Sequence, residues 1–218
     1  MNAKPSVNLW SISEHARDYL GRADSVPHRN EGESTLLEFI PATAQRMLDL
    51  GTGDGRLLAL VKAHLGVIGL EQVEAVAVDF SPAMLEAVRK RFAEDRAVTV
   101  VGHNLDNPLP ALGKFDTVVS SFAIHHLAHE RKRELYSEIY GSLNSGGAFC
   151  NLEHVASPTP RLHEEFLRNI DKTVETEDPS NKLLDLEAQL QWLREIGFVD
   201  VDCLWKWREL ALMVGRRA

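Results

Sequence analysis

The sequence has few cysteines, no long apolar run and a deficit of positive charge. Its two cysteines, Cys150 and Cys203, lie far apart inside apolar stretches, which excludes a disulfide framework, a C-x-x-C redox pair and a zinc cluster. We expect two buried free thiols in a reducing compartment. No apolar run approaches the length of about 18 residues that is needed to span a bilayer. The first residues also lack the apolar stretch of a signal peptide. These absences predict a cytoplasmic protein with no membrane partner.

The charge balance and the composition narrow the class of protein. Lys and Arg number 24 against 32 Asp and Glu, so the net charge is -8. Binding to a phosphate backbone normally requires clustered basic residues, so this balance weighs against a nucleic-acid partner. Apolar residues make up 44% and charged residues 26% of the 218 positions, as in ordinary globular proteins. We expect one domain over residues 1–218, whose oligomeric state the sequence leaves open.

Short apolar runs alternate with longer amphipathic segments, which is typical of a mostly parallel sheet covered by helices. The expected strands are residues 46–50, 75–79, 98–102, 115–120, 148–153, 199–204 and 209–214. The expected helices are residues 55–65, 82–93, 130–143 and 186–196, and Ser81 is expected to cap the second. Prolines within residues 107–110 favour a loop after the third strand. Only Trp205, Lys206 and Trp207 separate the last two strands, which predicts an antiparallel hairpin at the sheet edge.

Two long segments fall outside this alternation. Residues 1–45 precede the first strand, and residues 156–184 follow the fifth strand and contain Pro158, Pro160 and Pro179. Connections of this length in a compact domain are usually functional lids or linkers. We therefore expect residues 1–45 to form an N-terminal cap and residues 156–184 to form an inserted lid that determines substrate specificity.

A glycine-rich loop joins the first strand to the first expected helix. Its glycines at 51, 53 and 55 do not follow the G-x-G-x-x-G spacing of dinucleotide sites, and no Gly-Lys-Ser/Thr follows them as in a P-loop. Asp49 and Asp54 flank the loop and would repel a phosphate but attract an ammonium or sulfonium cation. The loop therefore favours a ligand without phosphate, although glycines between a strand and a helix can also serve turn geometry alone.

Polar residues follow the next two strands at the same sheet edge. Asp79 ends the second strand, 24 residues beyond Gly55, where a carboxylate can accept hydrogen bonds from two ribose hydroxyls. Phe80 could lie against an adenine ring or simply pack in the core. Asn104, after the third strand, could contact the same ligand or hydrogen-bond its own backbone in a turn. Together these positions indicate a nucleoside ligand.

The segments that carry these residues resemble the class I S-adenosylmethionine-dependent methyltransferases. The resemblance rests on LDLGTGDG at 48–55, AVDFSPAML at 77–85, VGHNLDNPLP at 101–110, FDTVVSSFAIHHL at 115–127 and LNSGGAFCNLEHV at 143–155. It implies an α/β fold, a Rossmann-like three-layer sandwich around a seven-stranded, mostly parallel sheet of order 3-2-1-4-5-7-6 with an antiparallel C-terminal edge hairpin. It also implies S-adenosylmethionine as cofactor and S-adenosylhomocysteine as product.

The resemblance assigns a contact to each part of the cofactor. Gly51 and Gly53 approach its methionine part, Asp49 lies near its amino group, Asp79 binds the ribose and Phe80 packs on the adenine. The remaining implied contacts are Leu105 on the purine, Ser120 and Ser121 near the sulfonium, and Arg29 with the carboxylate.

Asn104 stands where the family usually has an aspartate that contacts the adenine amino group. Its amide oxygen can still accept that hydrogen bond, and Asp106 is the competing candidate.

Histidines and a polar pair lie near the expected cleft. His125 and His126 follow the fourth strand, and a histidine there can take a proton from a nucleophile. In members of the family that methylate small amines or hydroxyls, a histidine at this step of the motif can orient or deprotonate the acceptor. We prefer His126, and the alternative is that both are structural. His129 would share a helix face with His125, but His126 points about 100° away and no carboxylate completes a metal site, so no metal is expected. Glu153 and His154 could touch the acceptor or make a structural hydrogen bond.

The sequence therefore predicts methyl transfer from S-adenosylmethionine to an oxygen, nitrogen or carbon atom of a small-molecule acceptor. Two alternatives stay open. The acceptor could be a macromolecule such as tRNA or a protein, or the chain could bind the cofactor without catalysis, because a fold does not determine a function.

Overall fold

A seven-stranded sheet organises the computed structural model, which describes residues 26–70 and 72–218. Its strands are β1 (Arg46–Leu50), β2 (Glu74–Asp79), β3 (Val98–Gly102), β4 (Phe115–Ser121), β5 (Leu143–His154), β6 (Phe198–Trp207) and β7 (Leu210–Arg217). They lie in the order β3-β2-β1-β4-β5-β7-β6. Strands β1 to β5 pair in parallel, and β7 pairs antiparallel with β5 and β6. The predicted strand order and antiparallel edge are confirmed.

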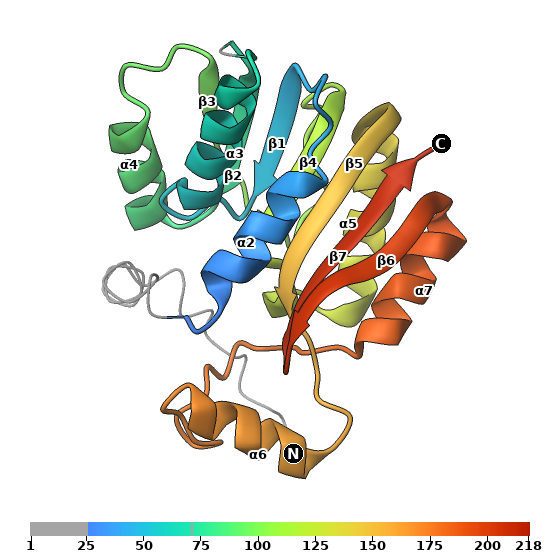
Figure 1. The fold of residues 1–218 in the computed structure, drawn as a ribbon. Coiled ribbons are helices and arrows are strands. Elements are labelled where there is room, and N and C mark those ends of the chain that lie inside the picture. Colours follow the sequence, from blue (N-terminus) through green and yellow to red (C-terminus); the bar gives the residue numbers. More distant parts are fainter. Residues whose placement is uncertain (1–25, 71) are drawn as a thin grey trace.

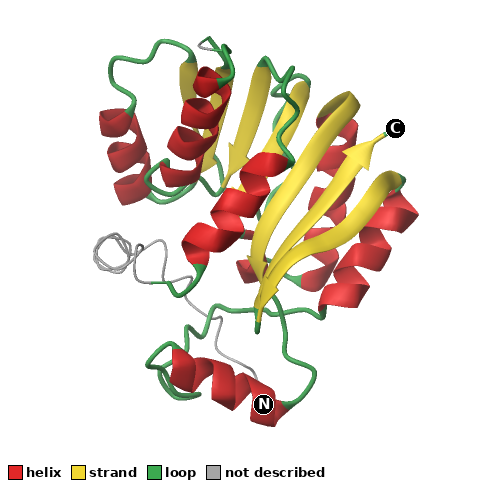
Figure 2. Cartoon of the chain, in the orientation of Figure 1, coloured by secondary structure: helices red, strands yellow, loops and turns green. Residues whose placement is uncertain are grey.

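Helices cover both faces of this sheet. They are α2 (Arg29–Glu38), α3 (Arg56–Val67), α4 (Pro82–Arg91), the 3-10 turn η3 (Ile124–His126), α5 (His129–Ser142), α6 (Pro160–Asn169) and α7 (Leu186–Ile196). Figures 1 and 2 show α2, α3 and α4 on one face and α5 and α7 on the other, with α6 away from these layers. The described part of the chain is thus a three-layer α/β sandwich. No helix within it is both long and apolar enough to cross a membrane.

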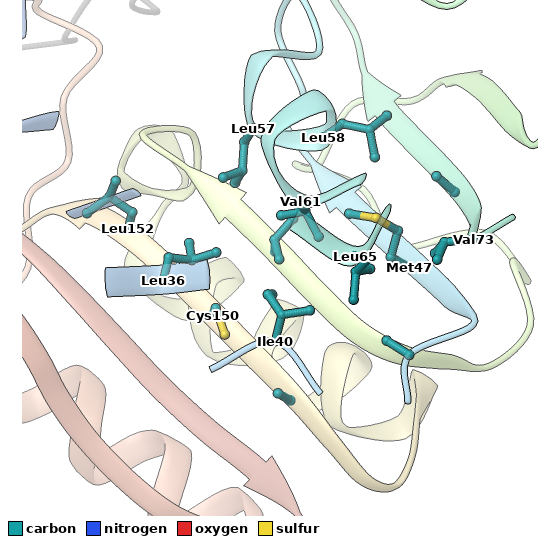
Figure 3. Packing of buried hydrophobic residues seen from close by; sticks show 14 of the residues in the cluster. Leu36, Ile40, Met47, Leu57, Leu58, Val61, Leu65, Val73, Cys150 and Leu152 are labelled. Carbon is teal, nitrogen blue, oxygen red and sulfur yellow. The ribbon is translucent and has the colours of Figure 1, made fainter. Parts of the chain in front are cut away.

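The core consists of two apolar clusters, one on each face of the sheet. On the face of α2 and α3, Leu36, Leu58 and Met47 are fully buried (Figure 3). On the opposite face, Tyr136 of α5 packs with Phe149 of β5, their ring centroids 5.6 Å apart. Covering a parallel strand on both faces explains why its sequence is a continuous apolar run instead of an alternating one.

The edge hairpin turns later than the sequence predicts. Trp205 and Trp207 belong to β6, and the chain reverses at Arg208 and Glu209. Both tryptophans pack against a small cluster that includes Phe166 of α6. This long-range contact extends the strand through residues whose sequence suggested a turn.

Helix α6 lies inside residues 156–184, the segment that was expected to form a lid. Thr159 caps it, since its hydroxyl accepts a hydrogen bond from the Leu162 amide at 3.3 Å. Pro160 occupies the first helical position, where the missing amide hydrogen is tolerated. One of the three prolines of this segment therefore starts a helix.

Two smaller expectations are confirmed only in part. Ser81 is the N-cap residue of α4, as predicted, but its side chain makes no capping hydrogen bond, and within the described residues its buried hydroxyl has no partner. Instead, the Ser81 amide donates to Asp79 at 2.9 Å. Of the two free thiols, Cys150 is buried, but Cys203 is only partly so. The expected N-terminal cap lies largely outside the described residues, and its described part contains α2.

Candidate functional site

A cavity lies where the loops after β1, β2, β3 and β4 meet. It encloses about 950 Å³, including its open mouth, and the residues that line it come from all four loops and from the start of α2. The carboxyl ends of parallel strands meet at one edge, which is why these loops converge.

The glycine loop forms one wall of the cavity. Gly51 and Gly53 have φ angles of +66° and +57°, which side chains rarely allow. A Cβ atom on Gly51 would lie 2.2 Å from the Cβ of Ala123, so Gly51 is required by the close approach of the loop after β4. A Cβ atom on Gly53 would meet only the Met84 sulfur, at 4.0 Å. Gly53 therefore keeps one side of the loop open to a ligand.

Asp79 holds the glycine loop against the end of β2. One carboxylate oxygen accepts from the Gly53 amide at 2.9 Å, and the other accepts from the Ser81 amide at 2.9 Å. Each oxygen keeps a second lone pair that a ligand hydroxyl can use. Burial raises the pKa of the Asp79 carboxyl, and these amide hydrogen bonds oppose the rise.

Asp49 is a second, more deeply buried acid in the cavity wall. Its carboxylate accepts a hydrogen bond from the Thr52 hydroxyl at 2.6 Å. Burial raises its pKa to about 7, the Thr52 bond opposes that rise, and the negative charge of Asp79 adds to it. A cation in the cavity would favour the ionised form of Asp49 by Coulomb attraction.

The residues after β3 line the cavity and also form a turn. Asn104, Leu105 and Asp106 are all in its wall. The Asn104 amide oxygen accepts from the Asp106 backbone amide at 3.0 Å, so the turn geometry weighed as the alternative is present. The same oxygen keeps a second lone pair. Phe80 lines the cavity as well.

The two serines at the end of β4 differ in position. Ser121 lines the cavity, and its buried hydroxyl has no hydrogen-bond partner among the described residues. Ser120 is not in the cavity wall, because its hydroxyl donates to the Leu50 carbonyl at 2.8 Å in the interior. Successive residues of a strand point to opposite sides, so only one of the pair can face the ligand. The structure therefore does not support Ser120 as a cofactor contact.

The two candidate histidines are likewise separated. His126 lines the cavity, whereas His125 is buried outside its wall, with Nδ1 2.6 Å from Oε1 of Glu153. Burial lowers the pKa of His125 and raises that of Glu153, which favours an uncharged pair. Burial and the neighbouring His125 lower the pKa of His126 to about 3. His126 is thus a neutral imidazole at pH 7, and the expectation for His125 as a catalytic group is not supported by its position.

Comparison with known proteins identifies the family. Residues 48–149 match the model of a methyltransferase domain. An uncharacterized methyltransferase of Bacillus licheniformis is 31% identical over 169 residues, which cover 74% of this chain and 68% of the relative. The chain belongs to the class I S-adenosylmethionine-dependent methyltransferases.

Two further similarities place this methyltransferase among its relatives. A demethylmenaquinone methyltransferase of Clavibacter sepedonicus is 29% identical over 185 residues, covering 78% of this chain and 71% of that protein. The structure of an O-methyltransferase family protein from Burkholderia thailandensis superposes with a TM-score of 0.72 at 21% identity. That match covers 96% of this chain but 61% of the other, so the methyltransferase spans less than two thirds of that neighbour, and the likeness shows a shared fold.

Arg29 of this methyltransferase lines the cavity, but its charge is already engaged. It begins α2, and its Nε donates to Glu33 at 2.8 Å. Its guanidinium also lies 5.5 Å from the centre of the Phe122 ring. Glu33 is shared with Arg56 at 2.8 Å. Arg29 therefore belongs to a charged group that fixes α2 beside the cavity, and a cofactor carboxylate would join that group.

Sequence reasoning missed several residues of the cavity wall. All of them lie within or next to the motifs quoted above. They are Thr52, Leu57, Met84, His103, Phe122, Ala123 and Leu127. Thr52 could have been found, because it lies inside the glycine motif next to Asp49. Within the described ranges, no three His, Cys, Asp or Glu side chains form a metal-binding cluster.

Proposed function

We propose that the chain transfers a methyl group from S-adenosylmethionine to an oxygen, nitrogen or carbon nucleophile of a small molecule. The observation that carries this proposal is that one cavity joins the glycine loop, Asp79 with Phe80, and Asn104 with Leu105. These are the groups that would hold the methionine, ribose and adenine parts of one ligand. When bound, the cofactor would supply an activated methyl group on its sulfonium. The rest of the cofactor is a neutral thioether after the methyl group has left.

The described polar atoms fit such a ligand. The lone pairs that remain on Asp79 would accept from the ribose hydroxyls, and the open side of Gly53 would admit the methionine part. Ser121 offers a buried hydroxyl without a partner among the described residues, which a polar atom of the ligand would satisfy. Phe80 and Leu105 would cover the two sides of the adenine.

The charge of the cavity also fits a cationic ligand. Asp49, Asp79 and Asp106 line it without an ion pair to a cation of the described residues, whereas Asp54 is paired with Arg91 and the Arg29 guanidinium is paired with Glu33. This excess of carboxylates disfavours phosphate groups and favours the sulfonium and ammonium charges of S-adenosylmethionine. The same charge supports the choice of this cofactor over a dinucleotide.

His126 is the group best placed to take the acceptor's proton. A pKa of about 3 makes its imidazole a weak base before the reaction. A hydroxyl oxygen or amine nitrogen that receives a methyl group becomes positively charged and gives up its proton readily, so a weak base suffices at that stage. Most of the rate enhancement then comes from alignment of the acceptor with the methyl group.

The acceptor site would lie beside His126, where the inserted segment 156–184 approaches. Lys182 of that segment donates from its backbone amide to the His125 carbonyl at 3.0 Å and from Nζ to the His126 carbonyl at 2.7 Å. The name of the Clavibacter sepedonicus relative specifies a small-molecule acceptor, which supports the same class here. We infer that residues 156–184 contribute to acceptor specificity.

Calorimetric titration with S-adenosylhomocysteine tests the cofactor part. Asp79→Ala should weaken binding by about 2 kcal/mol or more, roughly thirtyfold, because two hydrogen bonds to a carboxylate are lost. Glu86→Ala, which removes an exposed carboxylate from α4, is the matched control and should bind like the wild type. Thermal unfolding of each variant separates lost binding from lost folding. Absence of binding by the wild type would overturn the proposal.

A panel of acceptors with labelled S-adenosylmethionine tests the transfer. Label on small hydroxylated, amino or quinone-like compounds is the expected result. Label only on tRNA or protein would refute the small-molecule assignment, and cofactor binding with no transfer to any acceptor would refute catalysis.

A further inference from the structure

A hydrogen-bonded chain runs from the inserted segment 156–184 into the cavity wall. Ser180 is 6% exposed, and its Oγ lies 2.9 Å from Nδ1 of His126. The same Oγ lies 2.7 Å from Oδ1 of Asp178, which also accepts from the Ser180 backbone amide at 2.8 Å. Asp178 thus holds Ser180 through two hydrogen bonds, one from its backbone amide and one from its hydroxyl, and the same hydroxyl contacts His126 in the cavity wall.

The chemistry of these groups determines which atom donates. An ionised carboxylate only accepts, so the single hydroxyl hydrogen of Ser180 must point to Asp178. The Ser180 oxygen can then only accept from His126, which requires the hydrogen of the neutral imidazole to be on Nδ1. In that tautomer, Nε2 carries the lone pair.

We propose that Ser180, oriented by Asp178, is a positioning residue that holds His126 in the Nδ1-protonated tautomer, so that Nε2 can accept a proton from the acceptor substrate. The proposal rests on the proposed function for its catalytic consequence. The step balances simply: the acceptor atom forms the bond to the methyl carbon, the sulfur keeps the electron pair of the broken bond, and the acceptor's proton moves to Nε2.

The surroundings hold this arrangement in place. Lys182 donates to the His126 carbonyl, and Lys132 of α5 donates from Nζ to the Lys182 carbonyl. The backbone that follows Ser180 is therefore tied to η3 and to α5. A fixed tautomer needs such a frame, because imidazole rings otherwise exchange the hydrogen between their nitrogens.

Nitrogen NMR of protein labelled with ¹⁵N-histidine tests the tautomer without any acceptor. The two ring nitrogens of a neutral imidazole differ in chemical shift according to which carries hydrogen, and His126→Gln identifies the signals of His126. The wild type should show Nδ1 protonated. Ser180→Ala should shift the tautomer ratio about fivefold toward Nε2–H, the effect of one neutral hydrogen bond, and Ser180→Thr should restore the wild-type signal. An Nε2–H wild type would overturn the proposal.

Asp178→Ala is a second, independent variant. Without its carboxylate acceptor, Ser180 can donate to Nδ1, so the tautomer should shift toward Nε2–H although Ser180 is intact. The matched control is Ser157→Ala, which removes another serine of the segment that donates to a buried carboxylate, Glu209, but does not touch His126. An unchanged tautomer in Asp178→Ala, or the same shift in Ser157→Ala, would overturn the proposal.

Kinetics with an identified acceptor test the consequence for turnover. Ser180→Ala should lower kcat about ten- to hundredfold, as expected when a general base is misoriented, with the affinity for S-adenosylhomocysteine unchanged. A tautomer shift with unchanged kcat would overturn the positioning role. A wild type without turnover on any acceptor would instead contradict the proposed function. The NMR experiment would still show whether Ser180 and Asp178 determine the tautomer of His126.

Discussion

Replacing Asp49 with Asn should stabilise the ligand-free protein while weakening cofactor binding. Burial raises the pKa of this carboxyl from 3.8 to about 7. At 1.36 kcal/mol per pKa unit, that rise corresponds to about 4 kcal/mol. Between these two values the folded protein holds a proton that the unfolded chain has released, so the contribution of Asp49 to stability falls as the pH rises toward 7.

The stability gap between the variant and the wild type should therefore depend on pH. Asn carries no charge, and its amide oxygen can still accept from Thr52. Between pH 4 and pH 8 the free energy of unfolding of Asp49→Asn should rise by about 4 kcal/mol relative to the wild type. Urea unfolding at several pH values measures this difference. A gap that does not change with pH would refute the reasoning.

Cofactor binding should show the opposite preference. Only the ionised carboxylate attracts the cationic ligand, and with a pKa of about 7 it is roughly one tenth ionised at pH 6 and nine tenths at pH 8. The affinity of the wild type for S-adenosylmethionine should rise about tenfold over this range, with release of about half a proton per ligand at pH 7. In Asp49→Asn this part of the pH dependence should be absent.

Calorimetry in two buffers of different ionisation enthalpy counts the released protons. Asp54→Asn is the matched control, since it removes a carboxylate from the same loop that is 27% exposed and paired with Arg91. That variant should keep both the proton release and the pH-dependent stability of the wild type. Binding by the wild type without proton release would refute the coupling between cofactor binding and the ionisation of Asp49.

Three further perturbations follow from the same contacts. Gly51→Ala places a Cβ 2.2 Å from that of Ala123 at a φ of +66°, and should cost about 2–4 kcal/mol in urea unfolding; a change below about 1 kcal/mol would show that the loop moves freely. His126→Gln should lower kcat while the affinity for S-adenosylhomocysteine, measured by calorimetry, stays within about twofold, and equal losses of both would argue against a role in proton transfer. Burial alone would lower the pKa of His163, but the hydrogen bonds and negative charges of Glu209 and Glu177 together outweigh this effect and raise that pKa. The stability that His163 gains from its carboxylate partners is fully present below its ordinary pKa and is lost as the pH rises through its raised pKa in the folded protein. Hydrogen-exchange protection of residues 156–184 should therefore fall as the pH rises above that range, and His163→Gln should remove this pH dependence.

The sheet could be predicted from the sequence because its signal is local. The central strands are short apolar runs that end next to a glycine, an acid or a serine, as at Gly51, Asp79 and Ser121, and the parallel topology brings those ends together. Helix α2 could not be predicted in this way, because its sequence RNEGESTLLE is mostly polar. It packs because Gly32 lets it approach Leu152 and Trp205, where a Cβ would lie 2.8 Å and 3.0 Å from those side chains.

The candidate site was predictable to the level of a loop but not of a side chain. Sequence reasoning placed Ser120 and Ser121 together, and only the structure shows that the Ser120 hydroxyl is directed to Leu50. The same holds for His125 and His126, which one step of backbone separates into the interior and the cavity wall. Ser180 lies 54 residues from His126 in a segment without apolar periodicity, so no local pattern could have joined them.

The way the inserted segment is attached has a consequence for protein engineering. Residues 156–184 leave the sheet at the end of β5 and return at α7, and their apolar contact with the sheet is the packing of Phe166 of α6 against Trp207 of β6. One polar anchor of the segment is Glu209, which accepts from Ser157, is bonded to His163 at 3.0 Å and is held by His154 of β5 at 2.8 Å. The segment is therefore an exchangeable cassette. A chimera that keeps His154 and Glu209 in the host and supplies matching partners in the donor should graft a foreign acceptor preference onto an unchanged cofactor-binding scaffold.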